Sequence, residues 1–242
     1  MNQAIASAAI SLPTRFAALA VVLLLIAAIG FWPDYLNKPW KGIDAYTHVH
    51  AALGTAWLLL LIAQPLLIRS RSSATHRLLG QVSIVLAAGF VVVGILLTHV
   101  RFAPMPPEVF ARAAPFMSLP LTMTLLFAAA FLLALRWRKS PPVHARFMGA
   151  TAVALIDPAL ARANNLLFPP LPSSWMYQAI SFAVMAAILM TMWVTLPRAT
   201  RGRAAFQWFT CATIVVLGLL FVVPRTAGWL AFAGWFRGLP LT

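Results

Sequence analysis

The chain has 242 residues, of which 62% are hydrophobic and only 9% are charged, and its 18 Lys and Arg residues far outnumber its 4 Asp and Glu residues. A disordered or nucleic-acid-binding chain this basic would be poor in Leu, Val, Ile and Phe, and a soluble domain would need more surface charge. The composition therefore predicts an all-α integral membrane protein without a nucleic-acid partner. The single cysteine, Cys211, excludes an intramolecular disulfide and any multi-cysteine metal motif.

Seven apolar segments approach the length of about 20 residues that a helix needs to cross a hydrocarbon core of about 30 Å. The first ends in Phe31-Trp32-Pro33 and not in a small-residue cleavage site, so we expect a retained helix and not a signal peptide. A further segment, 229–239, is too short to cross and is expected to lie at the membrane interface. The sequence thus predicts one transmembrane domain, residues 1–242, with seven spans. These spans cover residues 16–32, 48–68, 78–100, 116–135, 147–167, 175–196 and 205–223.

Basic residues are distributed unevenly between alternate loops. Eleven of the 18 lie on the side that includes the N-terminus and seven on the other, whereas Asp34, Asp44 and Glu108 all lie on the second side. Because Lys and Arg near span ends stay in the cytoplasm, we expect a bacterial inner-membrane protein with a cytoplasmic N-terminus and an outer C-terminus. The basic rim should attract anionic lipid headgroups, at about 1 kcal/mol per exposed basic residue. The expected headgroup contacts are Arg69, Arg71, Arg77, Arg136, Arg138 and Arg146.

Two of the predicted cytoplasmic loops resemble each other. Residues 69–80 read RSRSSATHRLLG and residues 136–149 read RWRKSPPVHARFMG, so both begin with paired basic residues and end in a histidine, a nearby arginine, apolar residues and a glycine. The pattern indicates a parallel repeat of the span pairs 2–3 and 4–5. Alternatively, two short turns acquired arginines for topology and a glycine for close helix packing independently.

Polar and aromatic motifs recur between residues 47 and 165. They are His48 and His50 at the start of one span, Trp57 and Gln64 within it, His76-Arg77-x-x-Gly80 at the start of the next span, and His144-x-Arg146-x-Met148 at the start of another. In these motifs the chain resembles a family of uncharacterised bacterial multi-pass membrane proteins. The resemblance implies a common helical bundle and no assigned reaction.

Asp157 is the one carboxylate expected inside the membrane. It follows Arg146 by 11 residues, or about 16 Å of helix, which places it near the bilayer centre. A charge there costs several kcal/mol, and Pro158 frees a backbone carbonyl nearby. Asp157 is therefore interpreted either as a proton-accepting or cation-binding site, or as a structural partner of an arginine such as Arg162.

Polar residues in the second span share one helical face. His50, Gly54, Trp57, Leu61 and Gln64 are spaced by 4, 7, 11 and 14 residues from the first, so we expect them to face the bundle interior. Alternatively, the polar residues of this face form only interhelical hydrogen bonds, each of which stabilises the bundle by about 0.6 kcal/mol.

These positions predict a polar pocket in the outer half of the bundle, walled by spans 2, 3 and 5, that binds or transports a small ligand or a proton. Asp157 would be its centre, His50 and His99 its entrance and Trp57 its wall, and Arg162 would set the charge of the carboxyl group. No nucleophile motif is present, so we do not expect an enzyme.

The five histidines support a second hypothesis. His48, His50 and His99 are expected on the outer side, and His76 and His144 on the cytoplasmic side. Imidazole ligates transition metals and haem, so the pairs His50/His99 and His76/His144 would make a b-type haem protein of electron transfer, or the outer histidines a metal site. A third hypothesis is an accessory or assembly subunit without a ligand, whose histidines are interfacial or structural.

Overall fold

The computed structural model describes residues 2–38, 40, 42–168 and 170–242, with side chains from Thr14 onward, and these residues form an all-α bundle. Where the chain is described, the predicted segment 229–239 corresponds to a short helix, and every predicted span lies largely on a helix. The predicted spans 16–32, 175–196 and 205–223 run past the C-terminal ends of their helices. The elements are α1 (Asn2–Phe31), a π-helical turn (Trp32–Leu36), α2 (Ala45–Arg69), α3 (Ser73–Phe102), α4 (Pro107–Arg136), α5 (Pro141–Leu167), α6 (Ser174–Val194), α7 (Arg203–Leu219), a 3-10 turn (Val223–Arg225) and α8 (Ala227–Arg237).

Six helical segments within the described residues are long and apolar enough to cross a membrane, as in a multi-pass membrane protein. They are Thr14–Leu36, Ala45–Arg69, Ser73–Phe102, Pro107–Arg136, Ser174–Val194 and Arg203–Arg225. The predicted fifth span is not among them, because Asp157, Arg162, Asn164 and Asn165 lower the mean hydropathy of α5. A count of seven spans therefore stays a prediction.

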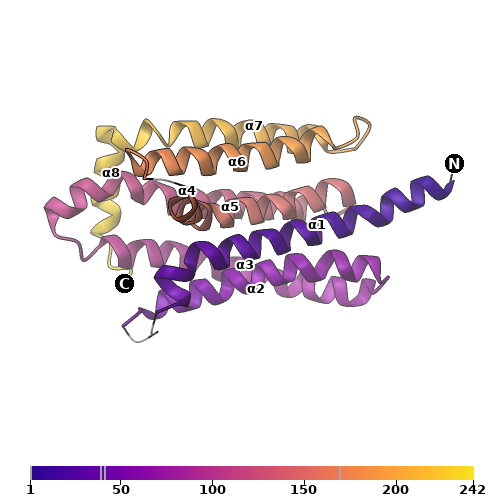
Figure 1. The fold of residues 1–242 in the computed structure, drawn as a ribbon, viewed down its shortest axis with the longest axis horizontal. Coiled ribbons are helices and arrows are strands. Elements are labelled where there is room, and N and C mark those ends of the chain that lie inside the picture. Colours follow the sequence, from indigo (N-terminus) through magenta and orange to yellow (C-terminus); the bar gives the residue numbers. More distant parts are fainter. Residues whose placement is uncertain (1, 39, 41, 169) are drawn as a thin grey trace.

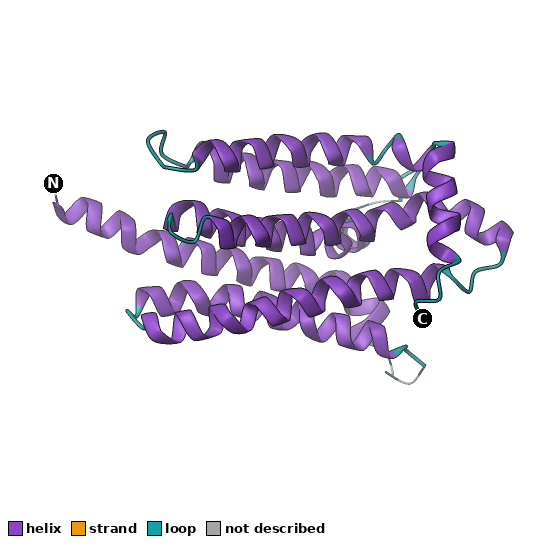
Figure 2. Ribbon diagram, turned by 180° about the vertical axis from the view of Figure 1, so that it is seen from behind, coloured by secondary structure: helices purple, strands orange, loops and turns teal. Residues whose placement is uncertain are grey.

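The first five helices form a closed ring. Each packs against the next along the chain, α5 also packs against α1, and α2 touches α5 across the ring. Figure 1 shows α4 and α5 between the pair α2–α3 and the pair α6–α7, with the two chain ends at opposite ends of the bundle. Outside the ring, α6 packs on α5 and α7 on α6, and α8 lies across the end of α3 and α4 (Figure 2).

Aromatic side chains fill the ring. Trp57 of α2 is fully buried, and its ring centre lies 4.9 Å from that of Phe127 and 5.3 Å from that of Phe131, both on α4. Phe90 of α3 lies 4.7 Å from Phe127, and the Trp57 Nε1 group donates a hydrogen bond of 2.9 Å to the Thr151 hydroxyl of α5. The predicted inward face of the second span thus packs against an aromatic core.

Gly30 of α1 allows a close backbone approach to α5. A Cβ atom at Gly30 would lie 3.0 Å from the Cα atom of Ala159 and closer still to its carbonyl oxygen. Only a residue without a side chain allows this approach, because both obstructing atoms belong to the backbone. Ala159 follows Asp157 and Pro158, so α1 covers α5 beside its buried carboxyl group.

We predict that Gly30→Ala lowers the free energy of unfolding by about 1–3 kcal/mol, because the added methyl group forces α1 away from α5. Gly218→Ala in α7 is the matched control, since a Cβ there meets no atom within 4 Å. Alanine is the better helix former by about 1 kcal/mol, so this control should keep or raise stability. Thermal unfolding in detergent, followed by circular dichroism, measures both variants, and equal midpoints would contradict the packing described here.

Candidate functional site

Asp157 lies at the interface of α5 with α6. Its side chain is only 2% exposed, and its Oδ1 atom accepts a hydrogen bond of 2.5 Å from the Gln178 amide nitrogen of α6. Neither ion pair found among the described residues involves Asp157. The carboxyl group is therefore buried, hydrogen-bonded by a neutral donor and not paired with a cation.

Arg162 contacts residues other than Asp157. Its Nε atom lies 3.4 Å from a carboxylate oxygen of Asp34, its guanidinium group stacks 4.9 Å from the ring centre of Phe31, and its Nη1 atom donates to the Pro158 carbonyl. Five residues along a helix correspond to a rotation of about 140°, so Arg162 and Asp157 project from different faces of α5. The predicted ion pair between them is not formed.

Further polar side chains continue from Asp157 along α5 and α6. The Asn164 amide nitrogen donates to the Tyr177 carbonyl at 3.3 Å and to the Ser181 hydroxyl at 3.1 Å, and all three residues are buried. We call Asp157, Asn164, Tyr177, Gln178 and Ser181 the α5–α6 polar seam. Sequence reasoning missed the α6 members, although their spacing of three and four residues marks one helical face.

His50 and His99 are not in one site. The His50 ring stacks on Phe90 at 4.5 Å between centres, and its buried Nδ1 atom has no partner. His99 is buried beside α8, where its Nδ1 atom lies 2.7 Å from the Thr242 hydroxyl and its ring meets Phe236. The two predicted entrance residues, which would also be the outer haem ligands, therefore have separate surroundings.

Two surface hollows of the described structure lie away from the predicted site residues. One hollow is lined by Ala28, Ile29, Trp32, Pro33 and Leu166, and another by Glu108, Val109, Arg112, Ala113 and Phe116. The region that α2, α3 and α5 were expected to wall contains the aromatic core around Trp57. Asp157 is thus enclosed by protein, which suits a proton better than a larger ligand.

His76 and His144 lie at the opposite end of the ring from α8. Counted from Ser73 and Pro141, each is the fourth residue of its helix, α3 and α5 respectively. The His144 Nδ1 atom lies 2.9 Å from the Ala134 carbonyl oxygen. The structure therefore places both histidines of this predicted pair at the same end of the ring.

One of the arginines expected at lipid headgroups is buried. Arg146 is 3% exposed, and its guanidinium group donates to the carbonyl oxygens of Met192 at 2.6 Å and Pro142 at 3.0 Å, with a longer bond to the Thr195 hydroxyl. It caps the C-terminal end of α6, where a cation is favoured, and does not face lipid. The other predicted headgroup contacts are exposed, namely Arg69, Arg71, Arg77, Arg136 and Arg138.

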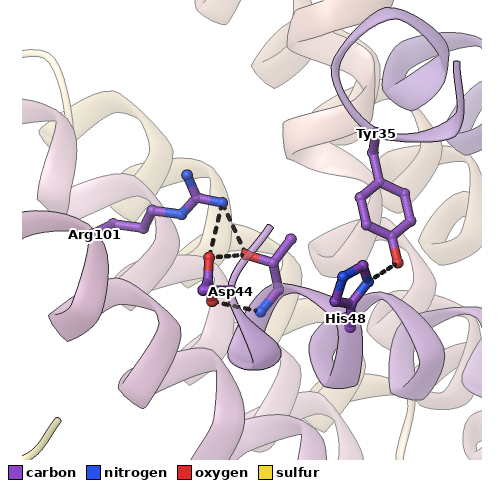
Figure 3. A network of polar contacts seen from close by, with 5 residues as sticks. Tyr35, Asp44, His48 and Arg101 are labelled. Atoms are coloured by element: carbon purple, nitrogen blue, oxygen red, sulfur yellow. Dashed lines mark hydrogen bonds and ion pairs between the residues drawn. The ribbon is translucent and has the colours of Figure 1, made fainter. Parts of the chain in front are cut away.

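A separate polar network lies at the start of α2 (Figure 3). Asp44 caps this helix by accepting hydrogen bonds from the Thr47 backbone amide at 2.9 Å and the Thr47 hydroxyl at 2.7 Å, and it lies 3.5 Å from Arg101. Partial burial acts to raise the pKa of Asp44, but the bonds from Thr47 and the charge of Arg101 outweigh burial and lower it below 3.8. Beside this network, His48 bonds to the Tyr35 hydroxyl at 3.0 Å, so its imidazole is engaged apart from His50.

No known protein family, curated protein or solved structure matches this chain. The resemblance to a family of bacterial multi-pass proteins therefore stays a prediction that rests on its motifs. The function has to be argued from the geometry of the bundle.

We predict that Asp44→Ala lowers the free energy of unfolding by about 1 kcal/mol at pH 7, because α2 loses its N-terminal cap. The pKa of Asp44 is lowered in the folded chain, so the contribution of its charge is present above pH 3.8 and disappears as the pH falls through the lower, folded value. Asp44→Asn keeps a capping oxygen, so its free energy of unfolding should fall less than that of Asp44→Ala. Unfolding midpoints measured at several pH values check this, and a deficit of Asp44→Ala that grew on acidification would contradict it.

Proposed function

We propose that this chain is a seven-helix protein of the bacterial inner membrane whose Asp157 carboxyl group binds and releases a proton. The N-terminus would face the cytoplasm, as the distribution of basic residues favours, and the exposed arginines at that end would contact anionic lipid. The enclosure of α5 by α1, α4 and α6 supports its role as the seventh span. A helix shielded from lipid does not need an apolar surface all round.

The observation that carries this proposal is a buried carboxyl group whose hydrogen-bond donor is the neutral amide of Gln178. Burying an ionised carboxylate costs several kcal/mol, and a buried charge normally has a cation or several donors around it. Since Asp34 pairs with Arg162, that cation is engaged elsewhere. The neutral, protonated form of Asp157 is therefore favoured in this conformation.

The α5–α6 polar seam gives the proton a route. Asn164 and Ser181 continue from Asp157 towards the Tyr177 end of α6, and the Tyr177 hydroxyl accepts a hydrogen bond from the Leu171 amide in the connection between the helices. Hydroxyl groups can relay a proton together with water, and the Asn164 amide can hydrogen-bond to such a water. The proton site would then communicate with the predicted outer side, as in a proton-coupled carrier.

We predict that Asp157→Asn removes this proton site and leaves the bundle folded. Asparagine keeps an oxygen that accepts the Gln178 hydrogen bond, so the free energy of unfolding should change by no more than about 1 kcal/mol. Infrared spectroscopy in H₂O and D₂O at neutral pH should show the C=O stretch of a protonated carboxyl group in the wild type. That band should be absent in Asp157→Asn.

Glu108→Gln is the matched control, because Glu108 is an exposed carboxylate and its loss should leave the band unchanged. Gln178→Leu removes the donor but keeps the carboxyl group, so the band should persist at a shifted frequency. A wild type without the band, or a band that survives in Asp157→Asn, would overturn the proposal. Visible haem absorption of the purified protein would instead favour the electron-transfer hypothesis.

A further inference from the structure

Four helices of the ring meet at the end that carries the α2–α3 and α4–α5 turns. Gln64 lies near the end of α2, His76 in the first turn of α3, Ala134 in the last turn of α4 and His144 in the first turn of α5. We propose that His76, His144 and Gln64 at this end bind a first-row transition-metal ion such as Cu²⁺ or Zn²⁺. This proposal does not depend on Asp157.

Two of these side chains have buried polar atoms without a partner. They are the His76 Nδ1 atom and the Gln64 Oε1 atom, and the Gln64 side chain is 9% exposed. The Gln64 amide nitrogen donates to the His76 carbonyl at 3.3 Å, so the unpartnered amide oxygen lies next to His76. A buried polar atom without a partner is unfavourable, and a bound ion would satisfy both of these atoms.

The third side chain is oriented as a metal ligand. The His144 Nδ1–H group donates to the Ala134 carbonyl at 2.9 Å, which leaves the Nε2 lone pair free. Metal-binding histidines characteristically donate their second nitrogen to a backbone carbonyl or a carboxylate in this way. His144 lies in the first turn of α5, at the same end of the ring as His76 in the first turn of α3.

The donor set selects the class of ion. Two imidazole nitrogens and one amide oxygen are neutral ligands, and imidazole suits copper, nickel and zinc. Calcium takes six to eight oxygen ligands and magnesium prefers carboxylates and water, whereas this donor set contains one amide oxygen and no carboxylate. Arg77 also acts electrostatically on His76, so the ion has to be held by strong coordination bonds and not by negative charge.

The test adds Cu²⁺ or Zn²⁺ to the full chain, without a histidine tag, in detergent. We expect one Cu²⁺ ion per chain with an electron paramagnetic resonance signal of two imidazole nitrogens. His76→Ala and His144→Ala should each weaken binding about tenfold or more, and Gln64→Leu less strongly. His48→Ala is the matched control and should bind normally, because His48 bonds to the Tyr35 hydroxyl.

Thermal unfolding supplies a second measurement that separates binding from misfolding. Zn²⁺ should raise the unfolding midpoint of the wild type and of His48→Ala, but not that of His76→Ala or His144→Ala. Without metal, the midpoints of His76→Ala and His144→Ala should stay near the wild-type value. Absence of stoichiometric binding, or equal binding by all variants, would overturn the proposal in favour of bound water. A haem absorption band that His76→Ala and His144→Ala abolish would overturn it in favour of a porphyrin.

Discussion

The close approach of α1 to α5 is the contact on which the arrangement of the other helices depends. Gly30 lets the two backbones meet at Ala159, and this contact closes the ring of the first five helices. Closure has two consequences for α5. It covers the side of α5 that packs against α1, and it encloses Thr151 of α5 in the aromatic interior around Trp57.

Much of the fold was predictable because hydropathy and helical periodicity are local properties. The predicted segment 229–239 matches α8, and the inward face of the second span was deduced from the spacing of His50, Trp57 and Gln64. The fifth span shows the limit of this reasoning. Hydropathy measures the suitability of a helix for contact with lipid, and α5 is surrounded by other helices.

The partners of the polar residues could not be predicted, because they depend on which helices pack together. Asp157 bonds to Gln178, and Arg162 to Asp34, although Asp157 and Arg162 lie closer to each other in the sequence. The partners of Arg146 also depend on helix packing. Its position at a span end suggested contact with headgroups, but the end of α6 lies beside it and supplies the carbonyl oxygens that it binds.

The polar seam and the ring interior lie on different faces of α5, and this separation restricts how a proton could cross the bundle. Thr151 faces Trp57 inside the ring, whereas Asp157 faces α6 outside it. Beyond Asp157, the buried α6 residues of the other half are apolar, namely Met185, Leu189 and Met192. Polar groups therefore reach Asp157 from one side only. If Asp157 binds a proton as proposed, that proton could leave towards the opposite side only when α6 moves against α5, as in a carrier and unlike a channel.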